Sequence, residues 1–215
     1  MKNGKAKVWI RLIAALALAG LIIPSHAFIR KQQTAADRTK ALGNIRQMGL
    51  SFFEFEAEFG RFPDESTAPM VKEKTRTPID LSGSSSNALF RQLLAYGLKS
   101  ELPFYARIQG SRKPDDRFDD DAHALAPGEC SFAYVAGLSG KNSPDTPLVL
   151  APLIPGTTRF DPVPFGGYAV ALFLDNSARP LPIDSNGCVM VGGKDIFDPS
   201  QPFWGGKAPD IKWQE

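Results

Sequence analysis

A short apolar segment close to the N-terminus limits what this chain can become more than any other feature. Leu12 to Ile23 contains twelve consecutive apolar residues. Four basic residues and no acidic residue precede this segment: Lys2, Lys5, Lys7 and Arg11. A positively charged flank stays on the cytoplasmic side of a membrane while the segment behind it enters the bilayer. The sequence therefore predicts that nearly everything after residue 27 is exported.

Two fates of the apolar segment agree with this pattern. A basic flank, a short apolar core and a small residue at Ala27 are typical of a signal peptide, which would be cleaved after Ala27. Alternatively, residues 8–28 form an uncleaved anchor, since these 21 residues match the ~20 that a helix needs to span hydrocarbon. We expect the anchor, as a single pass through an inner membrane with the N-terminus in the cytoplasm. The alternative is a soluble binding domain, released outside the cytoplasm by cleavage. A buried helix of a cytoplasmic domain fits less well, because four cations flank the segment.

A stripe of large apolar residues predicts a second helical region directly after the apolar segment. Its members are separated by three or four residues and share one helix face: Leu42, Ile45, Met48, Phe52, Phe55 and Phe59. Gly60 is suited to a left-handed cap and Pro63 ends any continuation. We predict an amphipathic helix over residues 28–60 that packs against a globular head, residues 61–215. A helix continuous with residues 1–27 would be interrupted or kinked at Pro24.

Four patterns stand out in the first 65 residues: the apolar residues 12–24, Ala27-Phe28, residues 38–50 with the order Asn-x-Arg-Gln-x-Gly, and Gly60-Arg61-Phe62-Pro63. On these residues, this region resembles the N-terminal region of type IV pilins and type II secretion pseudopilins. The resemblance implies a membrane-anchored structural subunit of a secretion or surface assembly, with other pilin-like subunits or secretion components as partners.

The chain departs from that family at the prepilin peptidase site. The family has glycine, then phenylalanine, with a glutamate a few residues on. Here the corresponding residues are Gly4-Lys5-Ala6-Lys7-Val8, and Asp37 is the first acidic residue. The family's glutamate pairs with a neighbouring subunit during filament assembly, so its absence bears on filament formation.

The head is expected to be rich in turns and short strands, because the chain contains 19 Gly and 18 Pro. We predict an α+β fold in which the long N-terminal helix packs on an antiparallel sheet, with an additional short helix at residues 87–96. A further helical stretch is expected at residues 68–74, and an exposed loop at residues 109–128. Strands are expected at residues 131–136, 147–152, 167–174, 179–183 and 188–191, and the two prolines of the fourth suit an edge strand.

Charge and residue content argue against nucleic-acid binding and against catalysis. Beyond residue 27 the chain has 21 basic and 23 acidic residues and no basic stripe, so we expect no nucleic-acid partner. The only histidines are His26 and His123, which leaves a pairing of His123 with Cys130 as the one thiol arrangement to consider. A solvated loop histidine is the ordinary interpretation, and we expect no enzyme and no cofactor.

A calcium site near the C-terminus is a weaker hypothesis, taken from the pseudopilin resemblance. Its candidate oxygen ligands are Asp184, Asn186, Asp195 and Asp198. Such residues also cap their own turns without a metal.

The two cysteines and the C-terminal aromatics each leave two interpretations open. Cys130 and Cys188 each begin a predicted strand in an exported protein, so they form either a disulfide or two buried free thiols. Trp204 and Trp213 lie in a tail that packs on the sheet or else forms an aromatic patch for a carbohydrate or protein partner.

Overall fold

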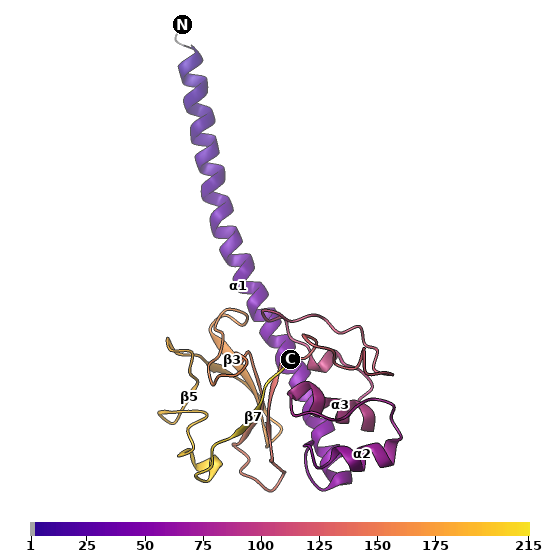
Figure 1. Ribbon diagram of the computed structural model, residues 1–215. Coiled ribbons are helices and arrows are strands. Elements are labelled where there is room, and N and C mark those ends of the chain that lie inside the picture. The colour runs from indigo at the N-terminus through magenta and orange to yellow at the C-terminus, as the bar shows by residue number, and fades with distance from the viewer. Residues whose placement is uncertain (1–2) are drawn as a thin grey trace.

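One helix dominates the shape of the molecule (Figure 1). The computed structural model describes the backbone of residues 3–215 and the side chains of residues 28–215. Helix α1 (Asn3–Phe59) has 57 residues, which corresponds to about 86 Å at 1.5 Å per residue. Its N-terminal half projects from the head, and its C-terminal half is built into it. The helix continues through Pro24, so the interruption expected there is absent.

The end of α1 follows from the local sequence. Gly60 has a φ of 79° and donates its N–H to the carbonyl of Glu56 at 2.7 Å. Only glycine adopts this left-handed conformation without a steric cost, so the helix stops at Phe59. Phe62 then turns back and is 1% exposed.

Two short helices cover one side of α1, while the sheet covers the other (Figure 1). They are α2 (Ala68–Thr75) and α3 (Ser86–Tyr96), and a 3-10 turn, η1 (Leu102–Phe104), follows. Pro69 lies in the first turn of α2, where its missing N–H has no partner to lose. Ser85 caps α3 by accepting a hydrogen bond from the N–H of Ala88 at 3.1 Å.

The main sheet is antiparallel and has five strands in the order β4-β3-β2-β1-β7. Its strands are β1 (Ala133–Ala136), β2 (Pro147–Ala151), β3 (Tyr168–Phe173), β4 (Ala178–Pro182) and β7 (Asp210–Lys212). The first four form a meander, and β7 returns to pair with β1. The chain is therefore an α+β protein, as predicted. The tail contributes a fifth strand that the sequence did not indicate.

Strand β4, which contains two prolines, lies at the edge of the sheet, as predicted. Pro180 pairs with Val170 and Pro182 with Tyr168. The neighbouring Ile183 donates its N–H to Gly167 of the preceding segment, whereas the two prolines have no N–H to donate. They occupy alternate positions, which face away from β3, so at these two positions the edge offers no outward donor to another strand.

The predicted strand at residues 188–191 is reduced to half its length. It forms β5 (Met190–Val191), which pairs only with β6 (Lys194–Asp195) in a small separate hairpin. The hairpin turns at Gly192 and Gly193, which both have a positive φ, and Gly187, also with a positive φ, precedes it.

Side-chain alternation along the strands divides the buried residues into two cores. One face packs toward α1 and α3 and includes Tyr134, Ala136, Leu148, Ala151, Val170 and Leu172. The opposite face packs against the C-terminal segment and includes Ala133, Val135, Leu150, Ala169, Ala171 and Phe173. Strands β1 and β2 and most of β3 are buried on both faces because the residues after β4 fold back over the sheet.

The stripe on α1 forms the centre of the first core. Ile45, Met48, Phe52 and Phe55 are 0% exposed, Phe59 is 9% exposed, and Leu42 is partly buried against them. Phe52 stacks on Tyr134 of β1 with ring centroids 5.3 Å apart. The burial of these side chains agrees with the predicted packing face.

The C-terminal segment packs as a layer over the second face of the sheet. Trp204, in the 3-10 turn η2 (Pro202–Trp204), is 7% exposed and donates its indole N–H to the carbonyl of Ile196 at 2.7 Å. Trp213 is half-buried and donates to the carbonyl of Thr157 at 3.0 Å. Of the two interpretations of these aromatics, the structure therefore shows the packed tail.

Candidate functional site

The part of α1 that leaves the head is the most unusual surface of the molecule. Residues 28–33 are exposed, and this stem includes the apolar side chains Phe28, 62% exposed, and Ile29, 58% exposed. The predicted apolar segment, residues 12–23, lies outside the residues whose side chains the structure describes. Among the residues that it does describe, no helix combines the length and the apolar character needed to cross a membrane.

Hydrogen bonds from the polar face of α1 attach the head to the helix. Asn44 donates to the carbonyls of Leu102 at 3.1 Å and Tyr105 at 2.7 Å, which fixes η1 against α1. Arg46 donates to the carbonyl of Ala178 at 3.2 Å, at the beginning of β4. Both residues belong to the pattern that carries the pilin resemblance, and here both bind the head.

Gly49, the last residue of that pattern, permits a close approach between α1 and the β3–β4 turn. It is buried, and a Cβ placed on it would overlap the side-chain oxygen of Asn176. Asn176 has a φ of 60° and makes the tight turn. A Cβ at position 49 therefore fits only if the side chain of Asn176 moves away from the helix.

The Gly-x-Phe-Pro turn also anchors the head. The ring of Phe62 makes edge contacts with Phe52 and Phe53, at centroid distances of 5.7 and 5.6 Å. The carbonyl of Pro63 accepts a hydrogen bond from the Tyr134 hydroxyl at 2.9 Å. Complete burial raises the pKa of Tyr134 well above its usual value, so this phenol stays a donor.

A final contact lies where the stem begins. The guanidinium of Arg38 donates to the carbonyl of Phe165 at 3.2 Å and lies 4.2 Å from the ring centroid of Tyr168. On the other side of the helix, a cavity of about 380 Å³ is lined by Asp37, Lys40, Ala41, Tyr105, Ala106, Arg107 and Lys113. Basic side chains thus surround α1 at the point where it leaves the head.

The calcium candidates do not converge. Asp184 accepts from the N–H groups of Asn186 and Cys188, each at 2.8 Å, while Asp195 and Asp198 each accept from the N–H two residues ahead. Every one of these carboxylates caps its own turn. In the described part of the chain, no group of three or more acidic, histidine or cysteine side chains could hold a metal.

The cysteines are two buried free thiols, so the disulfide alternative is not the one that the structure shows. Cys130 belongs to the core between the sheet and α1, and its sulfur lies 3.6 Å from the Ser86 hydroxyl. Cys188 contacts the guanidinium of Arg159, next to the hairpin that precedes the C-terminal layer. Cys130 precedes β1 and Cys188 precedes β5, and the two sulfurs have different neighbours.

The pairing of His123 with Cys130 is also absent. The Nδ1 of His123 lies 2.7 Å from a carboxylate oxygen of Asp120, within the same turn. Burial raises the pKa of Cys130 to about 11, so its thiol is protonated at neutral pH and is a poor nucleophile.

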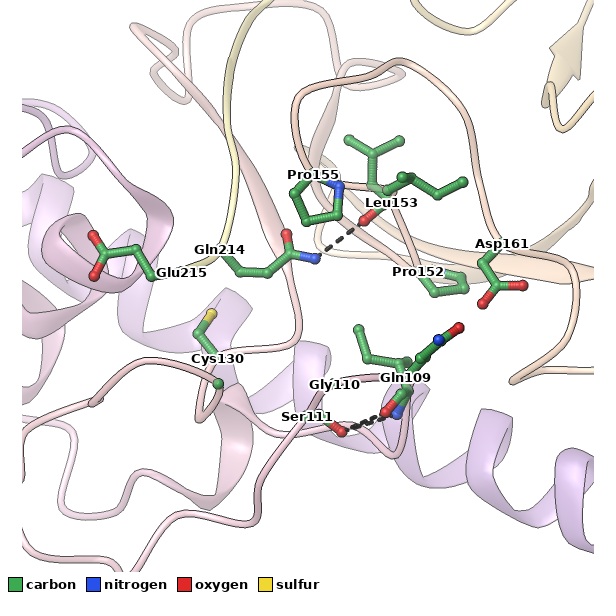
Figure 2. A pocket seen from close by; sticks show the side chains of 13 residues that line it. Gln109, Gly110, Ser111, Cys130, Pro152, Leu153, Pro155, Asp161, Gln214 and Glu215 are labelled. Atoms are coloured by element: carbon green, nitrogen blue, oxygen red, sulfur yellow. Dashed lines mark hydrogen bonds between the residues drawn. The ribbon is translucent and has the colours of Figure 1, made fainter.

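A second cavity, of about 350 Å³, lies between the C-terminal segment and two loops (Figure 2). Figure 2 shows Gln214 and Cys130 on one side of it and Pro152 and Asp161 on the other. Leu153, which completes the apolar wall, accepts a hydrogen bond from the Gln214 amide at 3.1 Å. The sequence did not indicate this cavity, which offers an apolar wall and a protonated thiol.

A buried carboxylate beneath the 109–128 loop also escaped the sequence analysis. Glu101 is 0% exposed; one oxygen accepts from the Leu125 N–H at 2.6 Å, and the other has no partner among the described residues. Burial, together with the nearby charge of Glu129, raises the pKa of Glu101 to about 7. Glu129 accepts from the Ala126 N–H, and these two bonds draw the middle of the loop into the core. The prediction of an exposed loop is therefore wrong for residues 124–126, which are buried.

Comparisons with models of protein families, with curated proteins and with solved structures found no match for this chain.

Proposed function

We propose that this chain is a membrane-anchored, exported structural subunit of a secretion or surface assembly, built on the plan of pilins and pseudopilins. One observation carries the proposal. A single helix forms one wall of the head's core and also projects far beyond the head (Figure 1). Such a helix can hold the head at a fixed distance from an anchoring segment.

The attachment of head to helix supports a mechanical role. The core packs six buried apolar side chains of α1 against the head, and Asn44 and Arg46 add hydrogen bonds on the polar face. Losing the contacts of one large buried aromatic or aliphatic side chain typically costs ~2–5 kcal/mol. A rotation of the head against α1 would break several such contacts, so the head keeps a fixed orientation on the helix. A force or displacement applied to the stem is therefore transmitted to the head.

The first experiment tests anchoring. The full-length chain is expressed with its own N-terminus, membranes are extracted at alkaline pH, and the mature N-terminus is determined by mass spectrometry. We expect retention in the membrane fraction with residues 12–23 intact. A soluble product that begins at Phe28 would instead support the second candidate, an exported binding domain released by cleavage after Ala27.

A second experiment tests self-assembly. Leu50 is 59% exposed on the side of α1 that the head leaves open, and a matched position, Met70 on α2, is 47% exposed. Both native thiols are buried, so a cysteine introduced at position 50 or 70 is the reactive one. We expect disulfide-linked dimers through position 50 and none through position 70. Monomers at both positions in the native membrane would count against a pilin-like assembly.

A further inference from the structure

Basic side chains gather around α1 where the helix leaves the head. Two belong to the stem, two lie at its junction with the head, and two come from the loop beside the 380 Å³ cavity. We call this set the basic collar: Arg30, Lys31, Arg38, Lys40, Arg107 and Lys113. One acidic residue, Asp37, lies among them.

The basic side chains at the cavity make no close ion pair with the described residues, although Asp37 lines the same cavity. Lys40, Arg107 and Lys113 form no ion pair within 4.0 Å among the residues whose side chains are described. Arg107 and Lys113 are exposed, and the ammonium of Lys40 lies 5.9 Å from the ring centroid of Tyr105. An anion can bind here without displacing a carboxylate.

The collar also stands out against the charge of the rest of the exported part. It has six basic residues and one acidic residue, whereas the remainder of residues 28–215 has 15 basic and 22 acidic ones. The head is thus acidic with a basic end, and that end faces the projecting stem. This asymmetry orients the molecule near a negatively charged surface.

We propose that the basic collar binds the phosphates of anionic phospholipids at the outer surface of the membrane. The inference rests on the proposed function, because it places a bilayer at the end of the stem. Phe28 and Lys40 are ~18 Å apart along the helix axis. The headgroup layer is ~5–8 Å thick and the screening length at physiological salt is about 8 Å. Arg30 and Lys31 then lie among the headgroups, and a helix tilt of about 20° brings the cavity toward them.

The test is a calorimetric titration of the full-length protein in a neutral detergent. Mixed micelles containing phosphatidylglycerol, mixed micelles containing phosphatidylcholine, and inorganic phosphate are the three titrants. We expect binding of phosphatidylglycerol that weakens with added salt, and no comparable binding of the other two. Each basic group near an anionic surface is worth roughly a factor of five in affinity, so Arg107→Gln/Lys113→Gln should bind about 25-fold more weakly. The control Lys141→Gln/Lys207→Gln removes two exposed charges outside the collar and should bind like the wild type.

Three outcomes overturn the proposal. Equal binding of both lipids by the wild type shows that the lipid charge is not recognised. If the control variant loses as much affinity as Arg107→Gln/Lys113→Gln, only the net charge of the protein matters. Binding of inorganic phosphate as tight as that of phosphatidylglycerol indicates a site for a free anion instead. Alkaline extraction of the wild-type protein separates the two proposals: a wild type that is anchored but does not prefer phosphatidylglycerol refutes the collar and leaves the proposed function standing.

Discussion

Replacing Glu101 by glutamine should stabilise the head at pH 8 and leave it nearly unchanged at pH 5. The folded protein holds the pKa of this carboxyl at about 7, against 4.5 for the exposed group. The folded state therefore binds the proton more tightly than the unfolded state. The stability that this proton confers is complete below pH 4.5 and is lost as the pH rises to 7.

The size of the effect follows from the same two values. A difference of 1.36 kcal/mol per pH unit over this interval amounts to about 3 kcal/mol. The side chain is 0% exposed, so water does not screen it. Glutamine keeps an acceptor for the Leu125 N–H and removes the buried charge facing Glu129, Asp115 and Asp116. We expect the variant to be more stable than the wild type by ~2–3 kcal/mol at pH 8. The gain is smaller than the full value because the buried amide hydrogens of glutamine lack partners, which costs part of it.

The assay is urea unfolding of the full-length protein in neutral detergent, followed by tryptophan fluorescence between pH 5 and pH 8. Glu73→Gln, which changes an exposed carboxylate on α2, is the matched control and should follow the wild type at every pH. If Glu101→Gln and the wild type differ by the same amount at pH 5 and pH 8, Glu101 is not the titrating group and the reasoning is refuted.

Three further predictions concern the packed contact between α1 and the head, which we call the seam, and the calcium hypothesis. Phe52→Ala should cost ~3–5 kcal/mol in urea unfolding, because it empties the site where three other aromatic rings meet; a loss below 1 kcal/mol would mean that the seam is not the core. Gly49→Ala should destabilise the wild type by ~1 kcal/mol through overlap with Asn176. In an Asn176→Gly background the same change should stabilise by up to ~1 kcal/mol, because alanine favours helix; equal effects in both backgrounds would rule out the contact. A chelator should leave the thermal midpoint unchanged, since the candidate calcium ligands cap their own turns, and a lowered midpoint would restore the calcium hypothesis.

Local patterns explain why α1 and most strands could be predicted. The spacing from Leu42 to Phe59 is a property of the helix itself, and so is the cap at Gly60. Strand β7 has only three residues and gains its identity from pairing with β1, some 75 residues earlier in the chain. No local pattern contains that information, so the sequence offers a packed tail as one of two interpretations and does not indicate a strand.

The cysteines and the buried glutamate show what sequence position leaves undetermined. Cys130 and Cys188 both precede strands, but the face of a side chain depends on register, and a shift of one residue reverses it. Glu101 is buried because η1 lies beneath a loop whose N–H groups at residues 125 and 126 need acceptors. A charged residue in a polar stretch gives no sign of this in advance.

The residues on which the pilin resemblance rests make contacts within the chain, and these contacts limit what the resemblance can say about assembly. Asn44, Gly49 and Phe62 each touch the head of their own chain: the first fixes η1, the second admits the β3–β4 turn, and the third packs on Phe52. Their physical role is to specify how a head is attached to a long helix. The motif therefore supports an architecture, a head attached to a long helix. Any assembly must depend on surfaces that these residues do not form, namely the stem, the basic collar and the open face of α1 around Leu50. Substitutions on those surfaces should change assembly and leave the unfolding midpoint of the head unchanged, whereas substitutions in the motif should do the reverse.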